Sequence, residues 1–259
     1  MKICLHYADF IDRDVLELFE DFKNVVAPER NIQLNIIGLK ETYKLKDYVQ
    51  FINVLDKETQ QKLQPAEILD LLKAGNERFT SGKFSDKHYL QQMNVTSDGQ
   101  NPMAIIVGCI DSRTSPEILF DAGIGDILTV RIAGNVINTD IIGSLEIAVA
   151  KLGAKLIVVK GHSKCGAVAL SLADVKGENM GAITEKIQKA AVQCGCFPKD
   201  PDANEAVVME RVTKKNVTNS MEDILNNSPY LKQRIEAGEV GIVGAGARAR
   251  NLSRMSSMA

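Results

Sequence analysis

Two short apolar runs constrain the fold of this chain most, because each is followed at once by side chains that can bind a metal ion. Residues 103–107 precede Cys109, and residues 155–159 precede His162 and Cys165. Each run has the length and composition of a buried β-strand. In an open parallel sheet, ligands bind at the carboxyl ends of the strands. The pattern therefore predicts that two thiols and one imidazole meet at one edge of a parallel sheet.

Strand and helix patterns alternate along the rest of this region, which predicts an α/β fold with a mainly parallel central β-sheet flanked by helices. Further strands are expected over 126–131 and 239–243. The expected helices cover 115–120, 140–152, 180–193 and 203–238. Ahead of them, Pro65 suits a first helical turn, and apolar side chains recur at helical spacing up to Gly82.

The sequence pattern divides the chain into four parts. Residues 1–40 form a partial, separate segment. Residues 41–64, rich in Lys, Gln, Asp and Glu, predict a linker or an amphipathic arm. The α/β domain is expected over 65–245. Residues 246–259 are small, polar and basic, which predicts a disordered tail.

The first segment has a strand–helix–strand pattern. Strands are expected over 2–7 and 32–39. Between them, apolar side chains share one face of a helix over 14–26. A unit of this size buries too little surface to fold well alone.

The composition is that of an ordinary globular protein, with 45% hydrophobic and 25% charged residues. A net charge of −2 gives no sign of a nucleic-acid or membrane-surface partner. No apolar run approaches the roughly 20 residues that span a bilayer, and the acidic Asp9 argues against a signal peptide. Five cysteines form no regular framework, which favours reduced thiols and a cytoplasmic location.

Cys109, His162 and Cys165 are ligand types that zinc accepts in tetrahedral geometry. Three protein ligands leave one position open, as in catalytic zinc sites, whereas structural sites usually have four. Two thiolates cancel the charge of the ion, so it should acidify water less than a three-histidine site does, where the pKa is about 7. We therefore expect a neighbouring group to assist.

Asp111 and Arg113 are the candidates for this assistance. Arg113 can bind the Asp111 carboxylate through two parallel hydrogen bonds and keep it ionised. A free lone pair of the carboxylate can then accept the proton of the attacking oxygen and orient it. If the pair opens, the same carboxylate can bind zinc and block the site, so the sequence leaves two arrangements open.

Together these motifs resemble those of β-class carbonic anhydrases. The resemblance rests on Cys109-x-Asp111-x-Arg113, on His162-x-x-Cys165-Gly166 and on Arg131-Ile-Ala-Gly-Asn135 between them. It extends over 65–245 and includes Gly75-Asn76-x-Arg78-Phe79.

The resemblance implies a zinc enzyme that reversibly hydrates carbon dioxide to bicarbonate and a proton. It implies one zinc ion per subunit, held by Cys109, His162 and Cys165, with Asp111 and Arg113 as a catalytic pair. It also implies a homodimer or a higher homo-oligomer, whose leading helices embrace the neighbouring subunit.

Two parts of the chain depart from the family pattern. After Ala245 the family usually adds one more strand, and here the small, basic tail takes its place, so we expect an incomplete sheet edge. Residues 1–40 are similar to the second half of a STAS domain, the cytoplasmic module of sulfate-permease-type anion transporters. This similarity implies a remnant of a transporter fusion and an association with the cytoplasmic face of a membrane.

Other interpretations of these residues are open. Two buried core thiols and an ordinary histidine would leave Asp111 and Arg113 unexplained. The same fold and metal could hydrolyse CS2 or COS. A weakly catalytic, bicarbonate-responsive module attached to an anion transporter is a further alternative, although it would not need that pair. Cys194 and Cys196 are expected to be free thiols, and His88 a surface side chain rather than a proton shuttle.

Overall fold

The computed structural model describes residues 2–4, 15, 18–19, 21–37, 54–85, 87, 89–173, 175, 177–196, 204–248 and 251–257. The chain forms two compact units, Met1–Ile52 and Asn53–Ala259. Each unit is described by itself.

The first unit contains two short parallel strands, β1 (Lys2–Cys4) and β2 (Asn35–Ile37). The C-terminal part of the helix expected over 14–26 is not regular α-helix. It closes in a π-helical turn over Phe22–Val26, where the Ala27 amide donates to the Phe22 carbonyl, and continues as α2 (Ala27–Glu29). Residues 5–14, 16–17, 20 and 38–40, which include parts of the expected strands and helix, lie outside the described residues.

The second unit begins earlier than the expected boundary at Pro65. Residues 54–64 include helix α3 (Lys57–Lys62), whose N-cap Asp56 accepts a hydrogen bond from the Thr59 amide at 2.7 Å. Gln60 is buried, and its amide donates to the carbonyls of Pro102 and Leu152 at 2.7 and 2.8 Å. Of the two alternatives expected for 41–64, a linker or an amphipathic arm, the packed helix over 57–62 does not fit a linker. Residues 41–53 lie outside the described part.

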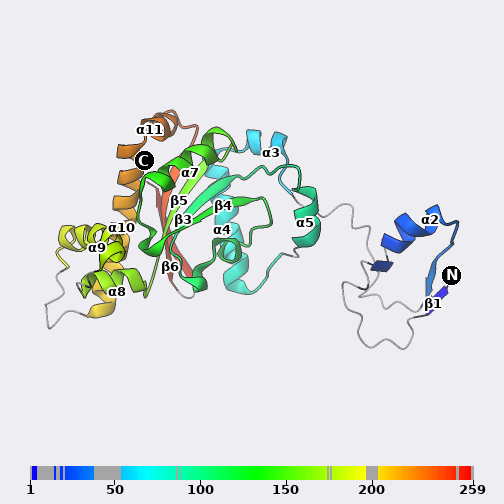
Figure 1. Ribbon diagram of the computed structural model, residues 1–259, viewed down its shortest axis with the longest axis horizontal. Helices are drawn as coiled ribbons and strands as arrows, with labels where there is room; N and C mark the ends of the chain where they lie inside the picture. Colours follow the sequence, from blue (N-terminus) through cyan, green and yellow to red (C-terminus); the bar gives the residue numbers. More distant parts are fainter. Residues whose placement is uncertain are drawn as a thin grey trace. The chain divides into compact units, whose positions relative to one another are not determined.

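A central sheet organises this unit (Figure 1), with the strand order β4-β3-β5-β6-β7. Its strands are β3 (Ala104–Gly108), β4 (Ile127–Arg131), β5 (Leu156–His162), β6 (Gly241–Arg248) and β7 (Asn251–Ser257). The first four in this order are parallel neighbours. The predicted parallel α/β fold is confirmed.

The C-terminal residues correct the expectation of a disordered tail and an incomplete edge. Strand β6 runs on to Arg248, and β7 pairs with it in antiparallel orientation, with a register shift between Ala245 and Ala247. Strand pairing needs only backbone N–H and C=O groups, so a tail of small and basic residues can complete the edge that β6 would otherwise leave open.

Alternate side chains of the central strands pack into two layers. One layer faces α7 (Thr139–Ala150), α10 (Glu205–Asn227) and α11 (Pro229–Glu236). Its strand residues are Ile105, Val107, Ile157 and Val159. Ala104, Ile106, Leu156 and Val158 face α4 (Pro65–Ser81) and the segment around Phe120. The strands are covered on both faces, which is the reason for their continuous apolar sequences.

Helix α4 is fixed to the turn after α6 (Pro116–Leu119), and this explains the Gly75-Asn76-x-Arg78 motif. A Cβ added at Gly75 would lie 1.8 Å from the Phe120 carbonyl oxygen, so only glycine allows this approach. Asn76 donates to the Leu119 carbonyl at 2.8 Å, and Arg78 donates to the buried Asp121 carboxylate at 2.6 Å.

The remaining helices are α5 (Tyr89–Val95), α8 (Gly166–Leu172) and α9 (Glu178–Gln193), together with 3-10 turns η4 (Ser112–Thr114) and η5 (Ala133–Asn135). Helices α8 and α9 share an apolar cluster with Cys109, with Cys165 and with Val136, the residue after turn η5. Within the described residues, none of the helices combines the length and apolar character needed to cross a membrane.

Candidate metal centre

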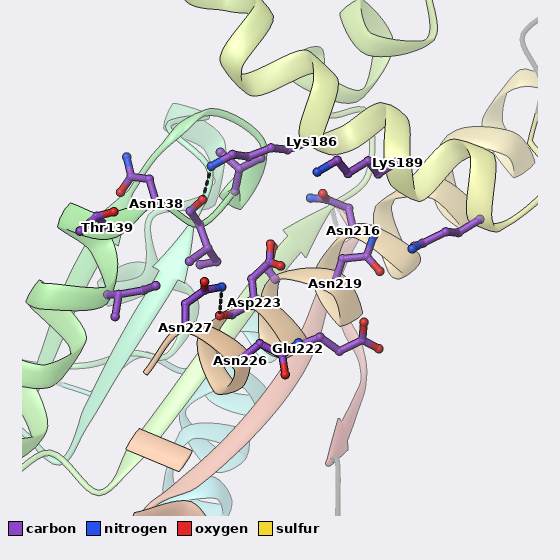
Figure 2. A pocket seen from close by; sticks show the side chains of 15 residues that line it. Asn138, Thr139, Lys186, Lys189, Asn216, Asn219, Glu222, Asp223, Asn226 and Asn227 are labelled. Atoms are coloured by element: carbon purple, nitrogen blue, oxygen red, sulfur yellow. Dashed lines mark hydrogen bonds between the residues drawn. The ribbon is translucent and has the colours of Figure 1, made fainter. Parts of the chain in front are cut away.

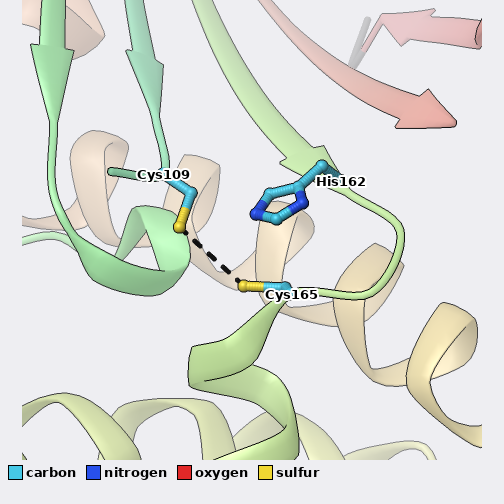
Figure 3. A group of neighbouring side chains, drawn as sticks. All are labelled: Cys109, His162 and Cys165. Atoms are coloured by element: carbon cyan, nitrogen blue, oxygen red, sulfur yellow. Dashed lines mark hydrogen bonds between the residues drawn. The ribbon is translucent and has the colours of Figure 1, made fainter. Parts of the chain in front are cut away.

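Three candidate ligands meet where two central strands end. Cys109 follows β3 directly, His162 is the last residue of β5, and Cys165 is the N-cap of α8. Because β3 and β5 are hydrogen-bonded neighbours, their carboxyl ends lie side by side. The potential ligand atoms of the three side chains all lie within 4.8 Å of one another, and all three residues are buried (Figure 3).

The donor set fits a zinc ion. The sulfur atoms of Cys109 and Cys165 are 3.9 Å apart. Two thiolates bound to one zinc at about 2.3 Å and a tetrahedral angle would be about 3.8 Å apart. The Nε2 atom of His162 is buried without a hydrogen-bond partner, which is rare for a buried polar atom that is not a ligand.

The orientation of His162 leaves that nitrogen free to bind. Its Nδ1 atom is 3.0 Å from the Ser163 carbonyl oxygen. A carbonyl can only accept, so the proton belongs on Nδ1 and the lone pair on Nε2. Lys164 then adopts a left-handed conformation, with φ of 57°, and the chain turns so that Cys165 begins α8.

The pKa values of the two thiols shift in opposite directions. The hydrogen bond between the sulfurs lowers the pKa of Cys109 and raises that of Cys165, whose pKa burial raises further. Cys109 also lies close to His162 and to the Gly134 amide, and both lower its pKa. Of the two thiols, Cys109 is the one whose surroundings favour the thiolate, although its own burial opposes this.

Asp111 and Arg113 form the doubly hydrogen-bonded pair that the sequence allowed. Arg113 donates from Nε to Oδ1 at 3.0 Å and from Nη2 to Oδ2 at 2.7 Å. This pairing holds the pKa of the Asp111 carboxyl well below its usual range. Asp111 Oδ2 lies 4.0 Å from His162 Nδ1. Of the two arrangements, the structure shows the paired one, with the carboxylate beside the ligand cluster and not part of it.

Arg131, at the end of β4, clamps this segment in a way that the sequence did not reveal. Its Nε donates to the Cys109 carbonyl at 3.0 Å, and its Nη2 donates to the Asp111 carbonyl at 2.6 Å. A third contact of 3.4 Å reaches Ser115. The motif Arg131–Asn135 is part of the family resemblance, but it does not indicate a contact for Arg131. The pairing of β4 with β3 places Arg131 beside the carbonyls of Cys109 and Asp111.

Lys160 is a second side chain that the sequence analysis missed. It is fully buried at the end of β5, and its Nζ donates to the Thr114 carbonyl at 2.7 Å. Burial, together with the nearby Arg131, lowers the pKa of Lys160 to about 8. A lysine directly after the apolar run 155–159, two residues before His162, was the available signal.

A polar cavity of about 520 Å³ lies between the N-terminus of α7 and helices α9 and α10 (Figure 2). None of the three candidate ligands lines it. Its wall includes Asn216 and Ser220 of α10, which hydrogen-bond to turn η5. The cavity therefore borders the side chains that hold turn η5, and not the candidate ligands.

Two further cysteines whose side chains the structure describes lie outside the cluster of candidate ligands. Cys194 and Cys196 are free thiols whose sulfurs contact the carbonyls of Ala191 and Cys194. His88 lies outside the described residues.

Comparison with known proteins agrees with this geometry. The family described as carbonic anhydrase matches residues 104–251. Carbonic anhydrase 2 of Mycobacterium tuberculosis is 34% identical over 185 residues, which cover 70% of this chain and 86% of that protein.

The chain belongs to the β-class carbonic anhydrase family. A carbonic anhydrase of Mycolicibacterium smegmatis is 32% identical over 182 residues, covering 70% of this chain and 87% of that protein. The present chain also shares its fold with a tetrameric β-carbonic anhydrase of Sordaria macrospora. The TM-score is 0.57 and the identity 24%, and the match covers 71% of this chain and 90% of that one.

Proposed function

We propose that this carbonic anhydrase hydrates carbon dioxide reversibly to bicarbonate and a proton, using one zinc ion per subunit. The ligands would be Cys109 Sγ, His162 Nε2 and Cys165 Sγ. The observation that carries the proposal is the buried, unpartnered Nε2 atom of His162 beside two sulfurs 3.9 Å apart. Zinc held by these three side chains would supply a Lewis acid that lowers the pKa of water.

The protein's own residues then position the reacting oxygen. Asp111 stays ionised because Arg113 donates two hydrogen bonds to it, and its Oδ2 atom lies beside the candidate ligand His162, 4.0 Å from Nδ1. A lone pair on this carboxylate accepts a hydrogen bond from the attacking oxygen and directs the oxygen's remaining lone pair at the carbon atom. Arg131 keeps Asp111 in place by donating a hydrogen bond to the main-chain carbonyl of Asp111.

Stopped-flow measurement of carbon dioxide hydration, with zinc content determined on the same sample, tests this proposal. Fast turnover that requires zinc and disappears in Cys109→Ser is the expected result. Full zinc occupancy without hydration would contradict it. Sulfide release from CS2 or COS would then favour the hydrolase alternative, and bicarbonate binding without turnover would favour the regulatory module.

We also propose that the protein is a homodimer or a higher homo-oligomer. Tyr89, Leu90 and Met93 of α5 expose 56%, 67% and 54% of their surface, which favours a partner surface there. The Sordaria macrospora relative is tetrameric. Light scattering on the purified protein measures the mass directly, and a monomer would contradict the proposal.

Two further predictions concern the setting of the enzyme. Free thiols at Cys109, Cys165, Cys194 and Cys196 are consistent with a cytoplasmic location. An association of the STAS-like residues 1–40 with an anion transporter stays a prediction. A genomic sequence without a transporter-like reading frame upstream would contradict it.

A further inference from the structure

We propose that Asn216 and Ser220 of α10 are positioning residues of the metal centre, which hold turn η5 so that the Gly134 amide donates to the sulfur of Cys109. The inference rests on the proposed zinc site and adds to it the side chains that orient one ligand. It concerns a helix that contributes no ligand and lies far from the motifs in sequence.

The contacts from α10 are direct and buried. Asn216 Nδ2 donates to the Gly134 carbonyl at 2.7 Å, and Ser220 Oγ donates to the Asn135 carbonyl at 2.9 Å. Both side chains are only 2% exposed. Four residues apart, they lie on the same face of the helix. Figure 2 shows Asn216 on the cavity wall, near Lys189 of α9.

Turn η5 needs these contacts because its conformation is unfavourable for an ordinary chain. Gly134 and Asn135 have φ angles of 67° and 47°, a left-handed region that costs free energy for residues other than glycine. A Cβ at Gly134 would lie 2.5 Å from Ile187 Cδ1, so the turn is also packed tightly against α9. Two carbonyls of the turn are thereby directed at α10.

The same turn directs its amide at the candidate ligand. The Gly134 N–H donates to Cys109 Sγ at 3.4 Å. Such a bond withdraws charge from a thiolate and fixes the direction of its lone pairs. Loss of an outer hydrogen-bond partner of a metal ligand typically weakens metal affinity about 10–100-fold. The path from α10 to the metal therefore runs through η5 to Cys109.

Two variants of the full-length protein test the proposal. Asn216→Leu has nearly the same shape and removes the donor to Gly134, and Ser220→Ala removes the donor to Asn135. Asn226→Leu, an exposed position on the cavity wall, and Thr218→Ala, an exposed hydroxyl bonded within α10, are the matched controls.

Zinc affinity, measured by competition with a chelator at fixed pH, is the main readout. We expect Asn216→Leu to lower the zinc affinity about 10–100-fold. Ser220→Ala should lower it by a smaller factor, below about 10-fold. The affinities of the controls should stay within about twofold of the wild type. With Co²⁺ in place of zinc, the thiolate-to-metal absorption band should shift in Asn216→Leu and stay unchanged in the controls.

A role in packing alone would lower the melting temperature equally with zinc and with chelator, and would leave affinity and absorption unchanged. That result in a folded variant overturns the proposal. If Asn216→Leu does not fold, Ser220→Ala decides by the same measurements. A wild-type protein that binds no zinc would overturn the proposed function as well, whereas normal wild-type binding without a change in the variants overturns this inference alone.

Discussion

The segment after β3 and the segment after β5 each deliver part of the candidate metal site, but they are held in different ways. After β3, Asp111 and Arg113 expose 16% and 65% of their side chains. The backbone there is clamped by the charged Arg131. After β5, His162 and Cys165 are only 3% and 2% exposed, and backbone conformation and packing hold them.

The difference separates two tasks of one site. The first segment combines a ligand with polar groups that reach solvent, so it can take up substrate and handle a proton. The second segment offers two candidate ligands in a buried wall, where Asp111 of the first segment is a charged neighbour, 4.0 Å from His162 Nδ1. Changes in the first should alter turnover more than folding, whereas changes in the second should alter metal binding or stability.

Loss of a ligand from the buried segment should have the largest effect. In Cys165→Ser we expect zinc content to fall close to zero and hydration to fall to the uncatalysed rate, because a hydroxyl is a poor substitute for a thiolate. Metal analysis and stopped-flow assays of the purified variant measure this. Cys194→Ser, a thiol outside the cluster, should keep both zinc and activity. A fully active, zinc-loaded Cys165→Ser would remove Cys165 from the ligand set.

Arg113→Lys should separate turnover from metal binding. Lysine cannot make the two parallel hydrogen bonds that hold Asp111, so we expect kcat to fall about 100-fold at unchanged zinc content. Arg234→Lys, a remote arginine that pairs with Glu239, should leave kcat unchanged. Loss of zinc in Arg113→Lys would show that the exposed segment also carries a structural task.

Asp121→Asn tests how the segment after β3 is anchored at its far end. Burial acts to raise the pKa of Asp121, but hydrogen bonds from Arg78 and Ser85 and the charge of Lys87 outweigh it and lower the pKa. Breaking this buried network should lower the free energy of unfolding by about 2–4 kcal/mol at neutral pH.

A carboxylate whose pKa is lowered by folding contributes stability above its ordinary pKa of about 4, and the contribution is lost as the pH falls through the folded value. The difference between Asp121→Asn and the wild type should therefore be full at pH 7 and shrink below about pH 4. Urea unfolding at several pH values measures it. Asp70→Asn, in an exposed pair with Lys73, should change stability by less than about 1 kcal/mol. A difference independent of pH would contradict the assignment to charge.

Gly161→Ala should have the smallest effect, and it acts on the segment after β5. An added Cβ would lie 2.8 Å from methyl groups of Thr213 and Val217 of α10. Overpacking of this kind costs about 1–3 kcal/mol, which thermal unfolding can detect while zinc stays bound. Gly166→Ala, where nothing lies within 4 Å, should be near neutral. Equal stability of the two variants would mean that packing on α10 does not hold this segment.

Much of this architecture could be predicted from the sequence because the signals are local. Apolar runs before Cys109 and before His162 indicate buried strands, and the candidate ligands lie at or directly after the ends of these strands. The pairing of Asp111 with Arg113 needs only two residues of separation. Even the parallel sheet follows from the alternation of strand and helix patterns along one stretch of chain.

Other features were decided by contacts between segments that are distant in sequence. The polar residues 54–64 look like a linker until Gln60 is seen to satisfy two carbonyls, and the C-terminal tail becomes β7 because β6 offers it an edge. No local pattern indicates that Arg131 clamps the Cys109 segment, or that Asn216 holds turn η5. The sequence by itself determined the ligand types and the strands that carry them. Which buried side chains hold those ligands in place was decided only by tertiary structure, because a hydrogen bond across the fold depends on where two distant backbones meet.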